Sequence, residues 1–485
     1  MKQMPFVKLA TGSVIPIALV LQAASQNPAS ADAARNMQMG IATHLAQYGV
    51  KCLPLLASTG VGWVRDGVDW SSIEKQKGVY VVPPKTREWI KAVHAHGLKL
   101  IFTIDGGNSL YQDPYDPEAY AAFAAAMTKQ LKGDVDAFEI LNEPANFGYT
   151  KQDNGSWNGI NKEGRVEPWV GRYVTLINKA AVAIKAADPN VKVIGLGSVA
   201  PVNFHQLAMG ISPSVDGVVD HPYSMRAAPE LVPYPSNGGI VARDGIATAD
   251  AQGTFASQIR MYREQSEKYH GPKEMWLTEW GFPTYQPTAP NAYAGYTQTA
   301  QAKYIQRRFV ESLGLGVTVS VVYDFEDDHG VNPHDPEWNF GLVTHDLKPK
   351  PSYYAVKRLV RVMEGWKVQT WGDVRVSPYD DRPDTWPIVW DSGKLASSGA
   401  IRAYQFVKPS GARAVALWST ERASSDLSPR AGEITITDNK KVAKIEIIDM
   451  MTDVRIHPAF HQVGANIVLK EITLPDSPVL MVLTE

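Results

Sequence analysis

Two short segments of this chain each deliver a glutamate to the end of an apolar run. The first reads Phe-Glu-Ile-Leu-Asn-Glu-Pro and ends at Pro144, and the second reads Met-Trp-Leu-Thr-Glu-Trp-Gly-Phe and begins at Met275. Apolar runs that are closed by Pro or Gly are typical of a buried strand followed by a loop. Glu143 and Glu279 are therefore predicted to lie at strand ends, where two carboxylates could face each other.

A facing pair of carboxyl groups suits the cleavage of an acetal C–O bond. One group protonates the departing oxygen, while the other stabilises or traps the positive sugar carbon. These roles demand different pKa values, so we expect one group in apolar and one in polar surroundings. Asn142 precedes Glu143, whereas Trp276 and Trp280 flank Glu279. Either segment alone is equally well explained by an ordinary solvated glutamate, but the two together favour a glycosidase.

Asn142-Glu143-Pro144 and Thr278-Glu279-Trp280-Gly281 resemble the signature of the clan A retaining glycoside hydrolases. Within the clan the chain is most similar to family 39, with family 5 as the nearest competitor, over residues 38–365. The resemblance implies a (β/α)8 barrel in which the acid/base follows strand four and the nucleophile ends strand seven. It therefore implies Glu143 as the acid/base and Glu279 as the nucleophile, with no cofactor.

The rest of the chain alternates between strand-like and helix-like segments. The apolar strand-like runs are 39–45, 62–65, 99–105, 137–142, 192–197, 217–221, 275–279 and 318–324. Segments with apolar residues at helical spacing lie between them and begin near Pro, Asp or Thr; they include 84–96, 117–131, 170–187, 254–269 and 296–313. Strands that alternate with helices predict a parallel sheet, and eight repeats favour a closed α/β barrel of the TIM type.

The active site of such a barrel forms at the C-terminal ends of the strands, and these ends are polar here. They carry His44, Arg65 with Asp66, Asp105, Asn142 with Glu143, Ser198, His221 with Tyr223, Glu279, and Asp324. A role in satisfying the barrel core explains any one of them and is favoured for Ser198 and Asp105. The convergence of all eight ends predicts a functional site, and Asp105 is retained as a candidate substrate contact.

Several of these residues have more specific expected roles. Arg65 is predicted to keep the nucleophile ionised through a charge-assisted hydrogen bond, and it matches the strand-two arginine of the clan. The resemblance implies that His221 and Tyr223 are the strand-six pair, with the tyrosine hydroxyl touching the nucleophile. It also implies that His44 reaches the sugar hydroxyls, and Asn142 is a further candidate substrate contact.

Aromatic residues gather in the loops that follow the strands, and sugar rings stack their apolar faces on such side chains. About half of them are expected only to close the top of the barrel. Trp280 and Trp338 are predicted substrate contacts, with Trp338 as the platform beneath the sugar, because segment 337–342 resembles the last active-site loop of the clan. The long loop 224–252 is expected to wall a groove or to narrow the site to a pocket.

Asp327, Asp328, His329, His334 and Asp335 form a group of potential metal ligands. Their spacing matches no recognised ligand pattern. A solvated loop near the mouth of the site is the favoured interpretation, so no metal is predicted.

The character of the chain changes after Val362. Short runs rich in Val, Ile and Trp occur at 365–371, 386–390, 401–407, 414–418, 433–437, 443–448, 466–469 and 479–483, with turn residues between them. This pattern predicts a β-sandwich at 365–485, following a catalytic barrel at 36–364. A packing role is favoured for the sandwich over carbohydrate binding, because nothing in it resembles a binding platform.

Residues 1–35 support two interpretations. Lys2 and Lys8 precede an apolar stretch at 14–24 and the small residues Ala29-Ser30-Ala31, which is the layout of a bacterial export signal. Alternatively, 6–9 and 14–21 are strands that join the sandwich. The signal is favoured, which predicts a secreted or periplasmic protein.

Composition limits the partners. The net charge is only −2 and no basic stretch is present, so nucleic acid is not an expected partner. A single cysteine, Cys52, excludes an intrachain disulfide. Beyond the N-terminal stretch, no segment approaches the ~20 apolar residues of a membrane span. The expected partner is a polysaccharide or oligosaccharide substrate. Hydrolysis, sugar transfer by the same residues, and catalytically silent polysaccharide binding remain the alternatives for function.

Overall fold

The computed structural model describes residues 35–485, apart from 147, 270–273, 331 and 425–427. The predicted export signal, or alternative pair of strands, falls on residues outside this described part. Within the part that is described, no helix combines the length and the apolar character needed to cross a bilayer.

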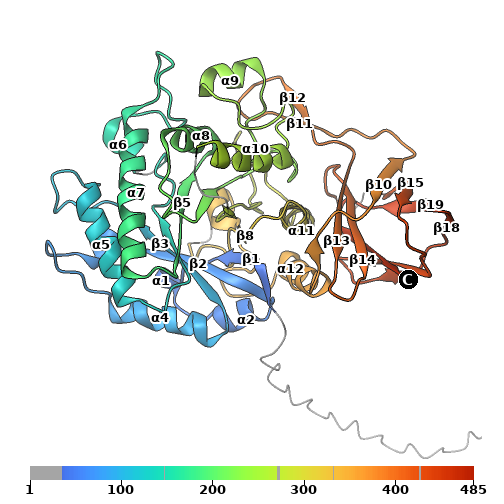
Figure 1. The fold of residues 1–485 in the computed structure, drawn as a ribbon, viewed down its shortest axis with the longest axis horizontal. Helices are drawn as coiled ribbons and strands as arrows, with labels where there is room; N and C mark the ends of the chain where they lie inside the picture. Colours follow the sequence, from blue (N-terminus) through green and yellow to red (C-terminus); the bar gives the residue numbers. More distant parts are fainter. Residues whose placement is uncertain (1–34, 147, 270–273, 331, 425–427) are drawn as a thin grey trace, which may run out of the picture. The chain divides into compact units, whose positions relative to one another are not determined.

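Eight parallel strands close into a barrel, each pairing with its neighbours in sequence order (Figure 1). Gly40 lies opposite Val321 where the first and last strands meet. The strands are β1 (Asn36–Ala42), β2 (Val61–Asp69), β3 (Lys99–Asp105), β4 (Ala137–Ile140), β5 (Lys192–Ser198), β6 (Gly217–Asp220), β7 (Glu274–Leu277) and β8 (Val319–Val322). The predicted (β/α)8 barrel is confirmed.

Helices cover the outside of the barrel. Several begin at Pro, Asp or Thr as expected; for example, the Asp116 side chain accepts hydrogen bonds from the backbone amides of Glu118 and Ala119. The helices are α1 (Leu45–Tyr48), α2 (Leu53–Ala57), α3 (Trp70–Ile73), α4 (Pro84–Ala95), α5 (Pro117–Gln130), α6 (Tyr149–Asp153), α7 (Pro168–Ala187), α8 (Ala200–Met209), α9 (Gly238–Asp244), α10 (Phe255–Lys268), α11 (Gln298–Gly314), the 3₁₀ turn η1 (Pro336–Asn339) and α12 (Pro351–Val362).

The C-terminal region consists mainly of two antiparallel sheets, one of order β10-β15-β19-β18 and one of order β17-β16-β20-β14-β13-β9. Aliphatic side chains from both sheets, such as Leu417 and Ile434, share one buried cluster, so the predicted sandwich is confirmed. The strands are β9 (Lys367–Val368), β10 (Asp373–Pro378), β13 (Ile401–Val407), β14 (Arg413–Ser419), β15 (Arg430–Thr437), β16 (Lys444–Asp449), β17 (Arg455–Ile456), β18 (His461–Val463), β19 (Asn466–Leu474) and β20 (Val479–Thr484).

The sandwich differs from the prediction in three strands that were not predicted, β10, β17 and β18, and in one strand that was placed wrongly. The edge strand β10 escaped detection because Asp, Arg and Ser interrupt its valines. Residues 386–390 were expected to form a sandwich strand, which is wrong. Thr385–Pro387 is β11, and it pairs only with β12 (Leu395–Ser397) in a separate hairpin. Pro387 has no backbone N–H to donate to a neighbouring strand. Figure 1 shows the hairpin beside α9 and α10, apart from the two larger sheets.

The other face of the six-stranded sheet packs against the barrel helices. Trp418 of β14 is fully buried in the cluster that also contains Phe309 of α11. At this contact Arg307 of α11 donates two hydrogen bonds to Glu230, of 2.9 and 2.6 Å. Trp418 donates a third to Glu230 at 2.7 Å. A buried ion pair thus links the barrel to the sheet.

Candidate active site

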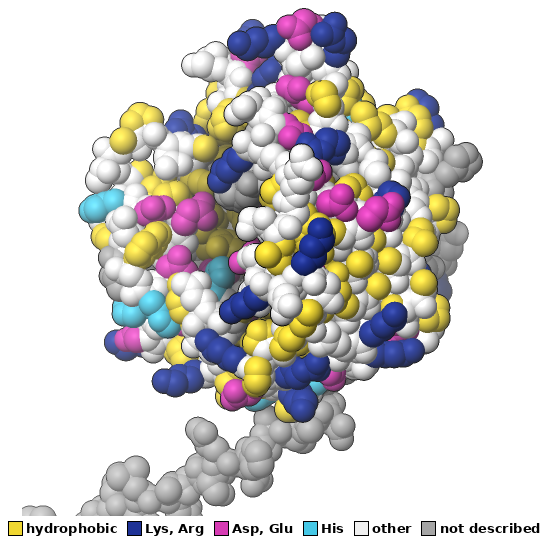
Figure 2. Space-filling model, turned by 90° about the vertical axis from the view of Figure 1, so that its left-hand side faces the viewer, with side chains coloured by type: hydrophobic (Ala, Val, Ile, Leu, Met, Phe, Trp, Pro, Cys, Tyr) yellow, Lys and Arg dark blue, Asp and Glu magenta, His cyan; other side chains and the backbone are white. Residues whose placement is uncertain are grey.

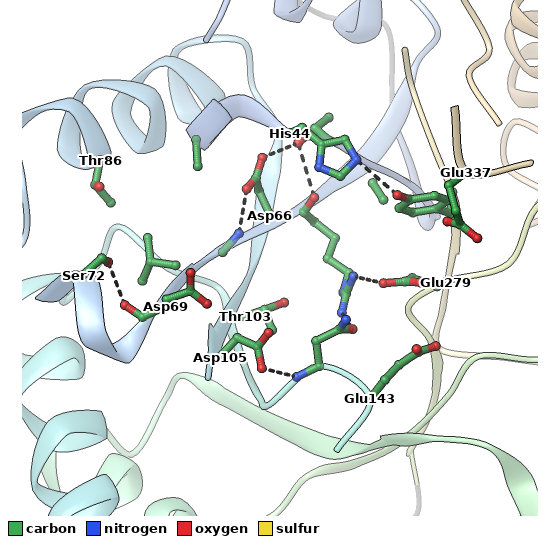
Figure 3. A pocket seen from close by; sticks show the side chains of 18 of the residues that line it. His44, Asp66, Asp69, Ser72, Thr86, Thr103, Asp105, Glu143, Glu279 and Glu337 are labelled. Carbon is green, nitrogen blue, oxygen red and sulfur yellow. Dashed lines mark hydrogen bonds and ion pairs between the residues drawn. The ribbon is translucent and has the colours of Figure 1, made fainter. Parts of the chain in front are cut away.

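A cavity of about 700 Å³ opens at the C-terminal ends of the barrel strands. Figure 2 shows a hollow edged by acidic and histidine side chains, and Figure 3 shows Glu143, Glu279 and Glu337 directed into the cavity from one side. Seven of the predicted site residues line it: His44, Arg65, Asp105, Asn142, Glu143, Tyr223 and Glu279. His221 lies just beneath its floor, with 5% of its surface exposed.

Glu279 follows β7 and is held through both carboxylate oxygens. The Arg65 Nη1 group donates to Oε1 at 2.6 Å, and the Tyr223 hydroxyl donates to Oε2 at 3.1 Å. Burial lowers the pKa of Arg65, but the nearby carboxylates outweigh burial and raise it above its ordinary value. Arg65 is therefore a permanent cation, and its hydrogen bond to Glu279 is charge-assisted.

The sequence reasoning missed Glu139, the fully buried partner of Arg65 on β4. Its carboxylate also accepts hydrogen bonds from the hydroxyls of Thr103 at 2.9 Å and Thr278 at 2.7 Å. Burial raises its pKa, but the charge and hydrogen bond of Arg65 and the nearby His221 lower the pKa of Glu139 to about 2. A charged residue inside an apolar strand was the available signal, because a buried charge requires a partner.

Glu143 lies in a tight loop after β4. Leu141 and Glu143 both have left-handed backbones, with φ of 60° and 42°, a conformation that costs a non-glycine residue about 1–3 kcal/mol. Neighbouring groups hold this loop in place. The backbone N–H of Asn142 donates to the Asp105 carboxylate at 2.9 Å, and the backbone N–H of Asn146 donates to the backbone carbonyl of Glu143 at 2.8 Å.

His221 connects the acid/base candidate to the buried network. Its Nδ1 lies 2.9 Å from Glu143 Oε1, and its Nε2 lies 2.9 Å from the Thr278 hydroxyl. Since Thr278 donates its own proton to Glu139, the hydroxyl oxygen must accept the Nε2–H of His221. One further proton is therefore shared between His221 Nδ1 and Glu143.

The electrostatics place that proton on the histidine. Burial lowers the pKa of His221, but Glu279, Glu139 and Glu143 outweigh it and raise the pKa to about 10. Burial raises the pKa of Glu143, but the hydrogen bond and charge of His221 hold it below its usual value. The expectation of an apolar setting for one catalytic carboxyl is thus wrong, because both carboxylates contact cations. The pair is best regarded as one titrating unit.

The two candidate catalytic carboxylates lie close together. One oxygen of Glu143 and one of Glu279 are within 4.8 Å of each other. Retaining glycosidases place these groups about 5–5.5 Å apart, whereas inverting enzymes leave about 6.5–9.5 Å for a water. The two carboxylates therefore lie close enough to act on one glycosidic bond.

His44 and Asp105 occupy the predicted cavity positions but also support their neighbours. His44 Nε2 lies 3.3 Å from Asp324 and 3.3 Å from the Tyr323 hydroxyl. Burial lowers the pKa of His44, but the hydrogen bond and charge of Asp324 and the charge of Asp66 raise it to about 9. His44 is thus a cation that can donate to a sugar hydroxyl.

The two predicted tryptophan contacts require correction. Trp280 is 1% exposed, and its Nε1 donates to Ser320 Oγ at 2.9 Å in the packing between barrel and α11, so it lies outside the cavity. Trp338 is half-buried, and its indole packs against Gly330. A Cβ atom added to Gly330 would lie 1.4 Å from the indole. The η1 turn therefore presents Glu337, rather than Trp338, to the cavity.

Tyr293, Tyr323 and Glu337 line the cavity, although sequence reasoning did not select them. Tyr323 precedes Asp324 at the end of β8, so the strand-end argument that found Asp324 could have found it too. Partial burial and the negative charges of Glu279, Asp335 and Glu143 raise the pKa of Glu337 to about 7. The cavity wall is therefore aromatic and acidic.

The loop that carries Asp327, Asp328 and His329, predicted to be solvated, contacts neighbouring residues. Asp327 accepts from Lys350 Nζ at 2.7 Å, and Asp328 accepts from the Tyr48 hydroxyl at 3.0 Å. His329 stacks on Tyr48 with ring centroids 3.8 Å apart. Among the described residues, two groups offer three metal-type ligand atoms each: His44 with Asp324 and Asp328, and Glu143 with His221 and Glu279. Contacts within each group already engage these side chains.

No protein-family model and no curated protein sequence matches this chain. Among solved structures, the chain is similar to a family 39 glycoside hydrolase from the gut symbiont Bacteroides cellulosilyticus WH2, at 19% identity and a TM-score of 0.66, over 93% of this chain and 81% of that one. It is also similar to a glucosidase from Croceicoccus marinus, at 13% identity and a TM-score of 0.52, over 93% and 96% of the two chains. The family 39 enzyme of Xanthomonas axonopodis pv. citri aligns at 13% identity and a TM-score of 0.51, over 93% and 95%. The chain therefore has the fold of clan A glycoside hydrolases, with a structural match to family 39.

Proposed function

We propose that this protein is a retaining β-glycosidase that hydrolyses a polysaccharide or oligosaccharide through a covalent glycosyl-enzyme. The observation that carries the proposal is the pair of carboxylates within 4.8 Å of each other, in two different hydrogen-bond settings. Glu279 is held by a permanent cation and a tyrosine hydroxyl, whereas Glu143 shares a proton with His221.

The first step forms one bond and breaks one. A carboxylate oxygen of Glu279 bonds to the anomeric carbon while the bond from that carbon to the leaving oxygen breaks. The leaving oxygen takes the proton that Glu143 and His221 share. Enclosure by substrate weakens the ion pair, because desolvation disfavours separated charge, and the proton moves towards Glu143.

The second step reverses the roles. A water gives its proton back to the pair of Glu143 and His221 and bonds to the anomeric carbon, which releases the Glu279 carboxylate. The sugar leaves with its original anomeric configuration. A sugar hydroxyl in place of water gives transfer instead of hydrolysis, with the same residues.

The test is a panel of β-linked polysaccharides and aryl β-glycosides, with released reducing ends as the measurement. Wild type is compared with Glu143→Gln and Glu279→Gln, and the anomer formed first is identified by NMR. Turnover with retention that both variants lose supports the proposal. Formation of the inverted anomer contradicts it, and saccharide binding by wild type without turnover supports the silent-barrel alternative.

We further propose action outside the cytoplasm. The support is the charge and apolar pattern of residues 1–31. Expression of the full chain in a bacterium followed by intact-mass measurement of the periplasmic and secreted fractions tests this. A shortened protein in those fractions supports export, and full-length protein confined to the cytoplasm contradicts it.

A further inference from the structure

A second cavity, of about 530 Å³, lies beside the catalytic one. Trp157 follows β4, Tyr234 follows β6, and Trp390 lies at the tip of the β11–β12 hairpin; all three line this cavity. The Trp157 ring lies 5.9 Å from Trp390 and 6.3 Å from Tyr234, at angles of 39° and 40°. Segments far apart in the sequence thus build one aromatic hollow.

The hairpin is anchored so that its tip reaches the barrel. Trp386 is 3% exposed, and its Nε1 donates to Ser398 Oγ at 3.1 Å. At the other strand, the Ser397 amide donates to the side chain of Gln252, just before α10, at 2.7 Å. Trp390 at the tip nevertheless remains 40% exposed. A large aromatic side chain held on an anchored hairpin and left open to solvent is a typical element of a binding surface.

Trp157 is also fixed from behind. The guanidinium of Arg243 in α9 lies 5.1 Å from its ring, and the amide of Asn158 donates to the Arg243 carbonyl at 3.0 Å. The two indoles are therefore held by separate elements.

Asn146 links the hollow to the acid/base carboxylate. It lines the aromatic hollow, and its side-chain amide donates to Glu143 Oε2 at 2.9 Å. Glu143 and Glu279 both line the catalytic cavity, and Glu143 is the one with a hydrogen bond to a residue of the hollow. The hollow therefore adjoins the acid/base side of the site rather than the nucleophile side.

We propose that the hollow binds the leaving-group part of the saccharide, with a sugar ring stacked on Trp390 and Trp157. This rests on the proposed function, because the acid/base carboxyl protonates the leaving oxygen and so lies on the leaving-group side of the cleaved bond. The apolar face of a pyranose suits indole rings, and Asn146 is placed to meet a sugar hydroxyl. The C-terminal region thereby contributes to substrate binding through its hairpin, in addition to packing.

The test compares substrates that do and do not reach the hollow. A β-glycosyl fluoride has a leaving group of one atom, whereas xylo-, cello- or laminari-oligosaccharides extend past the cleaved bond. In Trp390→Ala we expect kcat/KM to fall about tenfold on the oligosaccharide that wild type cleaves. Turnover of the fluoride is expected to stay within roughly twofold, and Trp390→Phe to recover most of the loss.

Tyr379→Ala is the matched control, because Tyr379 is an exposed aromatic residue of the C-terminal region outside the hollow. It should leave both substrates unaffected. Sugar transfer to an added acceptor provides a second readout, since the acceptor binds where the leaving group departed. Trp390→Ala should lose transfer product without slowing hydrolysis of the fluoride. Equal effects on both substrates, or none on either, overturn the proposal.

A wild type that cleaves neither substrate would contradict the proposed function but still leave the hollow testable. Tryptophan fluorescence is then titrated with the same oligosaccharides in wild type and Trp390→Ala. A saturable change that the variant lacks supports saccharide binding in the hollow, and identical titrations, or no change in wild type, overturn it.

Discussion

Two arginines in this molecule are buried against glutamates, and their surroundings differ in charge balance. At the interface with the sheet, Arg307 meets one carboxylate, Glu230, and donates two further hydrogen bonds to backbone carbonyls. In the site, Arg65 meets two carboxylates, Glu139 and Glu279. The interface pair is neutral and closed, whereas the site keeps one carboxylate whose charge is not fully neutralised.

This difference separates structural from chemical use of the same groups. Removal of one member of a closed neutral pair lowers stability, because it leaves the other member as an unpaired buried charge. A surplus carboxylate next to a cavity is held ready to bond to a positive carbon. Substitutions in the two regions should therefore affect different observables.

The largest expected effect is on activity, in Glu279→Gln. We expect turnover to fall by about 10⁴- to 10⁶-fold, as for removal of other nucleophiles. The free energy of unfolding should stay level or rise, because Arg65 keeps Glu139 and the surplus charge is removed. Enzyme kinetics and urea denaturation measure the two quantities. A large loss of stability with activity preserved would reverse the assignment of the two regions.

The interface should show the opposite pattern. Glu230→Ala leaves Arg307 buried without its carboxylate, so we expect the free energy of unfolding to fall by about 3–5 kcal/mol. Turnover by the remaining folded protein should not change. Urea denaturation and active-site titration separate these effects. The control is the double variant Glu230→Leu with Arg307→Met, which removes both charges and should recover much of the stability.

Thr278 tests whether the site network controls the proton. Thr278→Val removes the acceptor for His221 Nε2–H, a hydrogen bond to a charged group worth about 1.5–3 kcal/mol. We expect kcat to fall roughly ten- to a hundredfold and the alkaline limb of the pH profile to move to lower pH, because the imidazolium loses support. Thr278→Ser keeps the hydroxyl and should behave like wild type. Equal losses in both variants would point to packing instead.

The sequence predicted the barrel well because each strand is an apolar run closed by turn residues. It located Glu143 and Glu279 because strand ends meet at one rim of a barrel. It placed Trp338 wrongly, since motif position does not show whether a 3₁₀ turn directs one residue or its neighbour into the cavity. The sequence predicted a strand that included Trp390. In the structure Trp390 lies beyond Pro387 at the tip of a hairpin, and the strand pairing that forms this hairpin could not be read from the sequence. Proton location was also beyond the sequence, because it depends on which atoms surround His221.

The smallest expected effect concerns Glu337, whose pKa of about 7 adds a further titrating carboxyl to the site. As pH rises through 7 this side chain gains a negative charge beside Glu279, which favours the positive sugar carbon. Wild-type kcat/KM should therefore rise across this range by roughly fivefold, equivalent to about 1 kcal/mol in a wet site. Glu337→Gln carries no charge at any pH and should lack this rise, as a pH series on one aryl β-glycoside would show. Persistence of the same inflection in the variant would assign it to another group, and would leave the surplus charge of the site with Glu279 alone.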